Sequence, residues 1–152
     1  MANQHRTDVE YDMSVEYPDY QITGFYKAVS YHRNGTAGKS QWTISVDEEI
    51  DLFAKTKRNG YVYDDKGYAL WIVAEKAVVL GITEYQSETR LARFVDGTRT
   101  DHWRGYPANY LRAKNDIPPM HLLRQWKMDG LIEKSDITRL KLQKPCSLQK
   151  SL

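Results

Sequence analysis

The stretch Tyr68–Thr83, with the sequence YALWIVAEKAVVLGIT, is the most apolar passage of the chain. Only Glu75 and Lys76 interrupt it, and Val, Ile, Leu and Trp fill much of the rest. Runs of large and β-branched apolar residues on both sides of a short polar break are typical of strands covered on both faces. Two polar residues between two such runs predict a tight hairpin. We therefore expect a small, mostly antiparallel sheet centred on residues 68–83.

A capping pattern predicts the most distinct helix of the chain. Ser45 and Glu48 have the spacing of a capping box, in which each side chain bonds the backbone N–H of the other residue. Ile50 and Phe53 follow at helical spacing, three bases occupy the last turn, and a glycine comes next. The sequence thus predicts a helix over residues 46–59 that packs on the sheet.

Helical patterns return near the C-terminus. Two prolines at 118–119 suit the first turn of a helix, which runs through Trp126 to Gly130. Ser135 is expected to cap a further helix, so the two form a helical hairpin over residues 118–142. Together these elements predict an α+β fold.

Length and charge set the expected domain organisation. The chain has 152 residues, which favours a single domain. Residues 1–20 carry one base and five acids, a net charge of 1 − 5 = −4, whereas residues 109–152 carry nine bases and four acids, 9 − 4 = +5. We expect a mobile acidic arm (1–14), one α+β domain (15–145) and a frayed tail (146–152). The asymmetry fits an acidic arm on a basic surface, or a basic end that meets a polyanion.

Several function classes find no support in the sequence. Cys146 is the single cysteine, so neither an internal disulfide nor a cysteine-based zinc site can form. The four histidines lack the spacing of metal ligands, and we expect no metal or cofactor. The chain shows no basic-then-apolar leader and no apolar run long enough to span a bilayer, which predicts a cytoplasmic protein with no membrane partner.

A glycine-rich segment, GTAGKS at residues 35–40, resembles the end of a phosphate-binding loop. The full motif requires a glycine where Arg33 stands and a helix directly after the Lys-Ser pair. The following QWTIS favours a strand instead. The pattern therefore favours a flexible hairpin loop.

The passage Asp101–Pro107, DHWRGYP, is the most site-like part of the sequence. We expect it to lie in an irregular loop over residues 98–117, the kind of segment that carries binding and catalytic groups. His102 could move a proton near neutral pH, and Arg104 could hold a phosphate or a carboxylate. In the alternative interpretation, Trp103 and Tyr106 anchor the loop while the histidine and arginine stay solvated.

The C-terminal helical hairpin has the outline of a helix-turn-helix. Arg139 and Lys141 would lie on or near an exposed helix, where they could contact DNA phosphates. A helical hairpin built only for packing produces the same pattern.

Residues 86–95 fit either a short helix or a further strand. The surrounding segment VVLGITEYQSETRLARF resembles the second half of a GIY-YIG nuclease core, with Gly81 at the motif glycine and Arg90 at the helical arginine. That resemblance implies two tyrosines on the paired strands, where Trp71 and Val79 stand here, and a later metal-binding glutamate, for which Glu133 is a distant candidate.

These observations support two functional hypotheses. The first is a binding or regulatory module that grips a nucleic acid or a protein through an aromatic and basic loop (Trp103, Arg104, Tyr106) and the basic helical hairpin. The second is a phosphoester or nucleic-acid-processing enzyme with His102, Arg104 and Arg90 near one cleft. The sequence identifies neither the partner nor the oligomeric state.

Overall fold

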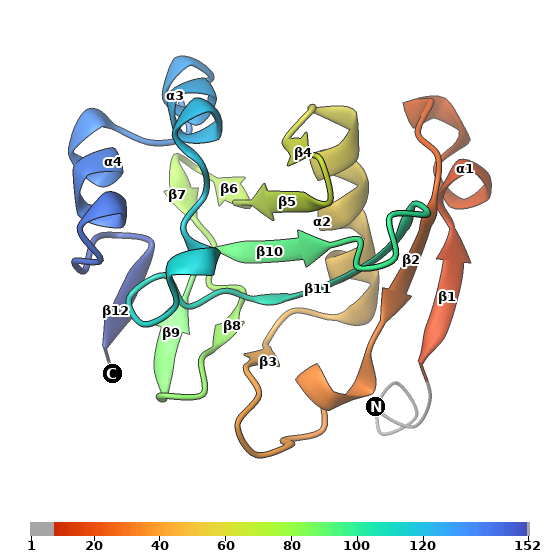
Figure 1. Cartoon of the computed structure of the whole chain (residues 1–152), viewed down its shortest axis with the longest axis horizontal. Coiled ribbons are helices and arrows are strands. Elements are labelled where there is room, and N and C mark those ends of the chain that lie inside the picture. The colour runs from red at the N-terminus through yellow and green to blue at the C-terminus, as the bar shows by residue number, and fades with distance from the viewer. Residues whose placement is uncertain (1–7, 152) are drawn as a thin grey trace.

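A six-stranded sheet organises the computed structural model, which describes residues 8–151. Across the sheet the strands follow the order β1 (Val9–Asp12), β2 (Phe25–Ala28), β11 (His102–Pro107), β10 (Ala92–Val95), β5 (Lys66–Ala69) and β4 (Val62–Tyr63) (Figure 1). All neighbours are antiparallel except β2 and β11, which run parallel. The predicted α+β class with a mostly antiparallel sheet is confirmed.

Shorter strands form two further sheets. A four-stranded sheet has the order β12 (Gln149–Ser151), β9 (Ser87–Thr89), β8 (Gly81–Ile82) and β3 (Gln41–Trp42), and a separate hairpin pairs β6 (Ile72–Val73) with β7 (Lys76–Ala77). The apolar stretch 68–83 thus contributes strands to all three sheets. Its hairpin turns at Ala74 and Glu75, one residue earlier than expected, and both adopt the positive φ (51° and 66°) that tight hairpin turns require.

The helix α2 (Val46–Arg58) has the predicted start and packs on one face of the large sheet. The Ser45 side chain accepts a hydrogen bond from the Glu48 backbone, and the Glu48 side chain accepts one from the Ser45 backbone. The buried Phe53 ring lies against Tyr26 of β2 and Phe94 of β10. In Figure 1 this helix passes behind β10 and β11.

The C-terminal helices build a second core away from α2. They are α3 (Met120–Met128) and α4 (Lys134–Lys141), and they confirm the predicted helical region. The cap of α4 is Glu133 rather than Ser135, because Glu133 and Asp136 form a reciprocal capping box. Trp126 and Leu140, both fully buried, pack in this core with Tyr68 of β5.

Shorter helical turns connect the remaining elements. They are α1 (Met13–Glu16) and the 3-10 turns η2 (Pro18–Tyr20), η3 (Ser30–His32) and η4 (Lys114–Asp116).

The expectation of an irregular loop over residues 98–117 was wrong in its central part. Residues His102–Pro107 form β11, the longest strand among the described residues, which pairs with β10 on one side and β2 on the other. Gly105 and Pro107 suggested a loop, but the strand requires the glycine and accommodates the proline. A Cβ on residue 105 would collide with the Phe94 ring, and Pro107 stands at the strand end, where a missing N–H is tolerated.

The chain ends also differ from expectation. Residues 1–7 and 152 lie outside the described part, but β1 of the expected acidic arm pairs with β2, and Met13 is fully buried. Within the expected tail, Cys146 and Leu148 are buried in the second core, and β12 pairs with β9. The extent of a single domain over residues 15–145 stays a prediction. Residues 86–95 form β9 and β10, so the helical alternative, and with it the helical arginine of the nuclease resemblance, is wrong.

Candidate functional site

The strand β11 has two chemically different faces. Trp103, Gly105 and Pro107 are buried, whereas His102 and Arg104 are exposed and Tyr106 is half-buried. Side chains alternate along a strand, so the first set faces α2 and the second set points to the other side of the sheet. We call that second side the open face. Its residues, set by the strand register, are Glu10, Asp12, Phe25, Lys27, Tyr63, Lys66, Tyr68, Arg93, Val95, His102, Arg104 and Tyr106.

The face toward α2 is a structural core, and it holds Trp103. The indole is only 4% exposed, contacts Phe53 at 5.6 Å between ring centroids, and donates to Asp101 at 2.7 Å. Asp101 also accepts from Lys57 of α2 and from Thr23. Burial alone would raise the pKa of Asp101, but these hydrogen bonds outweigh it and leave the pKa lowered. Trp103 and Asp101 therefore hold β11 against the helix.

A buried ionic cluster fixes the segment that follows β2. The Glu49 carboxylate of α2, with no exposed surface, accepts two hydrogen bonds from Arg33 and one from the Tyr26 hydroxyl. Arg33 also donates to the carbonyl of Ile44 at 2.8 Å. Burial raises the pKa of Glu49 to about 7, although Arg33 and Tyr26 both act to lower it. This cluster anchors the base of the glycine-rich loop on α2.

The glycine-rich loop itself is folded by local polar contacts. The Gln41 side chain donates to the carbonyls of Tyr31 and Lys39 and accepts from the Gly35 N–H. The Asn34 side chain accepts from the Thr36 N–H, an arrangement typical of a turn. No helix follows the Lys-Ser pair, because β3 begins at Gln41. The phosphate-loop geometry is therefore absent, but the loop ends beside the open face.

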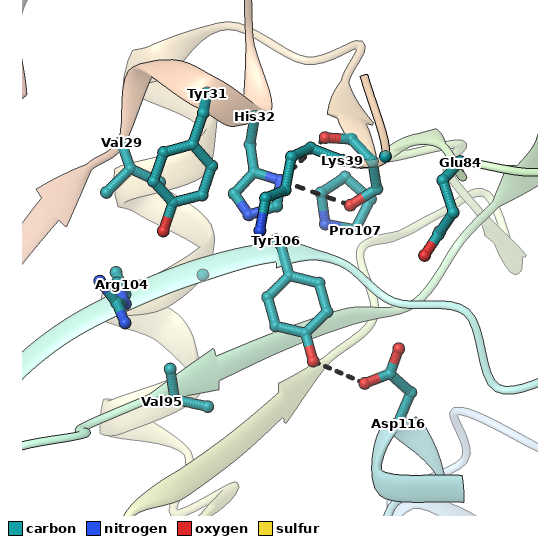
Figure 2. A pocket seen from close by; sticks show the side chains of 13 residues that line it. Val29, Tyr31, His32, Lys39, Glu84, Val95, Arg104, Tyr106, Pro107 and Asp116 are labelled. Atoms are coloured by element: carbon teal, nitrogen blue, oxygen red, sulfur yellow. Dashed lines mark hydrogen bonds between the residues drawn. The ribbon is translucent and has the colours of Figure 1, made fainter. Parts of the chain in front are cut away.

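A cleft of about 270 Å³ lies where this loop meets β11 (Figure 2). One wall comes from the loop and η3, the floor from β10 and β11, and the far end from the turn after β8 and from η4. The lining residues are Val29, Tyr31, His32, Gly38, Lys39, Ser40, Glu84, Val95, Arg104, Gly105, Tyr106, Pro107 and Asp116. Two of the sequence-predicted residues, Arg104 and Tyr106, therefore lie in one cavity.

His32 is the most constrained group in the cleft. Its ring is 8% exposed and stacks on Tyr106 at 5.5 Å between centroids. Its Nδ1 lies 2.8 Å from the Ser40 carbonyl oxygen, which can only accept, so Nδ1 carries a proton. Burial lowers the pKa of His32, and the nearby charges of Lys39 and Arg104 lower it further. The lowered pKa favours the neutral ring, in which Nε2 is a hydrogen-bond acceptor.

Tyr106 is fixed from below by a second polar cluster. Its hydroxyl donates to Asp116 at 2.6 Å and accepts from Arg93 at 2.9 Å. Asp116 is 4% exposed and also accepts from the Asn109 N–H. Burial and the neighbouring Asp116 carboxylate raise the pKa of Tyr106, so the phenol stays protonated. The ring is therefore a rigid apolar surface rather than a proton donor to a ligand.

Two cations at the cleft carry no counter-charge. Within residues 8–151, the Arg104 side chain has neither a hydrogen bond nor an ion pair, and the Lys39 ammonium lies over the Tyr31 ring, 5.1 Å from its centroid, without an ion pair. Glu84, at the other end, likewise has no hydrogen bond in the described part of the chain. Figure 2 shows Arg104 and Glu84 on opposite sides of the stacked His32 and Tyr106. The cleft is therefore positive at one end and negative at the other.

His102 lies on the open face outside this cleft. Its ring stacks on Phe25 at 4.7 Å between centroids and 11° between planes, and its Nδ1 lies 2.9 Å from the Thr100 carbonyl oxygen. The two rings therefore cover one face of each other, and the exposed His102 ring lies one position from Arg104 along the same face of β11.

Arg90 lies elsewhere, in a groove between the β6–β7 hairpin and the C-terminal helices. The guanidinium donates to the carbonyls of Ala77 and Ser147. This groove also contains Glu133, the distant candidate of the nuclease resemblance, whose carboxylate belongs to the α4 capping box. The structure therefore does not bring Arg90 together with His102 and Arg104.

The remaining predicted binding residues are on α4. Arg139 is exposed and donates to the Pro145 carbonyl at 3.3 Å, and Lys141 is exposed. Neither lines the cleft beside β11.

Sequence reasoning missed His32, Lys39 and Glu84 as members of the site. Lys39 and Ser40 belong to the glycine-rich segment, and its likeness to a phosphate-binding loop was the one sequence signal that could have indicated them. The parallel pairing of β2 with β11 brings that segment to Arg104, and nothing in the local pattern predicts a parallel pair between distant strands.

Comparisons add no relative from which a role could be transferred. No protein family, no curated protein and no solved structure matches this chain. Residues 8–151 hold no group of three or more His, Cys, Asp or Glu side chains placed to bind a metal. In the same range, no helix has the length and apolar character needed to cross a membrane.

Proposed function

We propose that this protein binds single-stranded nucleic acid along the open face of its large sheet. The observation that carries the proposal is the alternation along β11, which displays His102, Arg104 and Tyr106 side by side on the surface opposite α2. Proteins that bind single strands combine cations that contact phosphates with aromatic rings on which bases stack. The open face offers both kinds of group.

The cations are available for phosphates. Arg104 and Lys39 have no ion pair among residues 8–151, and Lys27 is an exposed member of the same face. Ion pairs elsewhere in the described structure use other bases, such as Lys55 with Asp51 and Lys57 with Asp101. Unpaired bases close to one another raise the local positive potential, which attracts a polyanion even when the net charge of the chain is only +2.

The aromatic groups are rigid, which favours stacking. The His102 and Phe25 rings lie in nearly parallel planes and stack on each other, and Tyr106 is held by Asp116 and Arg93. Ordered rings lose little conformational entropy when a base stacks on them. Trp103, which the sequence also suggested as a binding residue, is buried on the opposite side of the sheet, against Phe53 of α2.

Fluorescence anisotropy with a labelled single-stranded oligonucleotide of about eight nucleotides tests the proposal. We expect binding that weakens as salt rises, with log K falling by about 0.7 per phosphate contact for each unit of log salt. Arg104→Ala should weaken binding about fivefold or more, because a charged hydrogen-bond donor is lost. Arg124→Ala, on the exposed side of α3, is the matched control and should bind like the wild type.

Two results would contradict this proposal. Absence of salt-dependent binding by the wild type would remove nucleic acid as the partner and favour a protein partner. If the double variant Arg139→Ala/Lys141→Ala lost more affinity than Arg104→Ala, the strand would be held by the C-terminal helices instead.

The enzymatic alternative has less support. A phosphoester-cleaving site would require Arg90 near His102 and Arg104, because catalytic groups must touch or share a water molecule. Arg90 and Arg104 line different cavities.

A further inference from the structure

A second cavity lies beside α2 and shares no residue with the cleft beside β11. Its volume is about 370 Å³, and it forms where α2 meets Tyr17, between α1 and η2, and Trp71, between β5 and β6. Both aromatic side chains are half-buried, and the buried Leu52 of α2 also lines the cavity. The cavity therefore offers two aromatic rings and one aliphatic side chain to a ligand.

Three carboxylates share the cavity with these rings. They are Asp47, Glu48 and Asp51, and the one base beside them is Lys55, so the lining side chains carry a formal net charge of 1 − 3 = −2. The Asp47 carboxylate forms neither a hydrogen bond nor an ion pair within residues 8–151. Asp51 pairs with Lys55 at 2.9 Å, yet 41% of its side chain stays exposed. The charge of the cavity thus favours a cationic ligand.

The rings next to the cavity already bind a cation of the chain itself. Tyr17 packs on Tyr20 at 5.1 Å between ring centroids, and the Arg58 guanidinium lies over Tyr20, 4.2 Å from its centroid. Burial and the nearby Asp51 carboxylate raise the pKa of Tyr17 to about 12, so its ring stays neutral at physiological pH. A neutral ring beside carboxylates attracts a cation through its π face.

The chemistry of the lining favours arginine over other cations. A guanidinium stacks on aromatic faces and carries five N–H donors in a planar arrangement that matches carboxylates. A lysine ammonium is a compact and more strongly hydrated charge. A quaternary ammonium also binds aromatic rings, but it has no N–H to donate to Asp47 or Asp51.

We propose that this cavity binds an arginine side chain from a basic segment of a partner protein, with the guanidinium against Tyr17 and Trp71 and its N–H groups donating to Asp47 and Asp51. The exposed Glu48 suits a further base next to that arginine. The cavity shares no residue with the open face, so its occupation leaves that face free. The inference therefore goes beyond the proposed function and does not depend on it.

A peptide series on the wild-type protein tests the inference without any mutation. The labelled peptides share flanking lysines and differ at one central position, which carries arginine, citrulline, lysine or trimethyllysine. Citrulline has nearly the shape of arginine but no charge. By fluorescence anisotropy, we expect the arginine peptide to bind about tenfold more tightly than the citrulline peptide and about threefold more tightly than the other two, because only a guanidinium combines stacking with paired N–H donors.

Variants locate the binding at the cavity. Asp47→Asn/Asp51→Asn removes both carboxylates with little change of shape and should reduce the preference for arginine over citrulline to about twofold or less. Trp71→Leu keeps an apolar side chain but removes the ring, and should weaken binding of the arginine peptide about threefold. Asp64→Asn/Glu84→Gln removes two charges elsewhere and should keep the wild-type preference. Circular dichroism melting checks that each variant is folded.

Several results would overturn this inference. Equal affinity of the wild type for the arginine and citrulline peptides would show that no guanidinium is recognised. Tighter binding of the trimethyllysine peptide would make the cavity a site for methylated ammonium groups. Equal losses in the cavity variant and its control would indicate attraction by overall charge. Self-association of the wild type in sedimentation, abolished by Asp47→Asn/Asp51→Asn, would assign the cavity to a base of a second copy of this chain.

Discussion

The two faces of the large sheet use the same strands for opposite purposes. Toward α2, Tyr26, Phe94 and Trp103 are almost completely buried. The Tyr26 hydroxyl donates to the buried Glu49 carboxylate, and the Trp103 indole donates to Asp101. On the open face, Lys27 follows Tyr26 along β2 and Arg104 follows Trp103 along β11. Neither forms an ion pair within the described residues, and Glu10 of β1 lies opposite Lys27 in the sheet. Neighbouring positions in one strand can thus serve the core and the surface separately, because successive side chains point to opposite sides of the sheet.

The sharpest test of this separation uses adjacent residues of β11. Trp103→Ala should lower the free energy of unfolding by about 3–5 kcal/mol, because it leaves a cavity beside Phe53. Arg104→Ala should change it by less than about 0.5 kcal/mol, since the side chain is exposed. Urea denaturation followed by tryptophan fluorescence and circular dichroism measures both. Similar losses for the two variants would show that the faces are not independent.

A smaller effect is expected from pH acting on the covered face. The pKa of Glu49 rises to about 7 through burial, above the ordinary value of 4.5 for the unfolded chain. The folded state therefore binds this proton more readily, and the associated stability is fully present below pH 4.5 and is lost as pH rises through about 7.

Relative to Glu49→Gln, the wild type should lose about 1–3 kcal/mol of stability between about pH 5 and pH 7.5. The comparison with the glutamine variant cancels the titration of all other groups. Urea denaturation at both pH values gives the difference, and an unchanged difference would mean that the buried cluster with Arg33 does not titrate in this range.

The smallest effect concerns the open face alone. Lys27→Ala should leave the free energy of unfolding within about 0.5 kcal/mol and reduce the slope of log K against log salt by about 0.7, the contribution of one phosphate contact. Lys55→Ala on α2 removes an equal charge from the opposite side of the sheet and should leave the slope unchanged. Equal changes in both variants would indicate binding through overall charge rather than through the open face.

Local signals predicted the elements that depend on nearby residues. The capping box of Ser45 and Glu48 fixed the start of α2, and the apolar stretch around Glu75 indicated a hairpin. The His102–Pro107 strand was missed because its alternation mixes charged, aromatic, glycine and proline residues, which resemble a loop when the neighbouring strands are unknown.

The cleft depends on contacts between distant segments. Pairings between distant strands bring His32, Lys39 and Glu84 to β11, and no local sequence pattern predicts these pairings. Arg33 was the residue that most misled the prediction of the cleft. Its position argued against a phosphate loop, yet its side chain anchors the loop beside Arg104 by binding Glu49. The sequence shows that basic and aromatic residues are present. Only the fold shows which of them come together in the cleft.

The parallel pairing of β2 with β11 has a consequence for how the chain acquires its structure during synthesis. Phe25 aligns with His102, so the early strands β1 and β2 lack their inner neighbour until about two-thirds of the polypeptide has emerged from the ribosome. Contacts between residues so far apart in sequence are slow to form because closing the intervening loop costs entropy. The nascent N-terminal hairpin therefore has one uncovered edge until β11 is made, the same strand that forms the floor of the cleft.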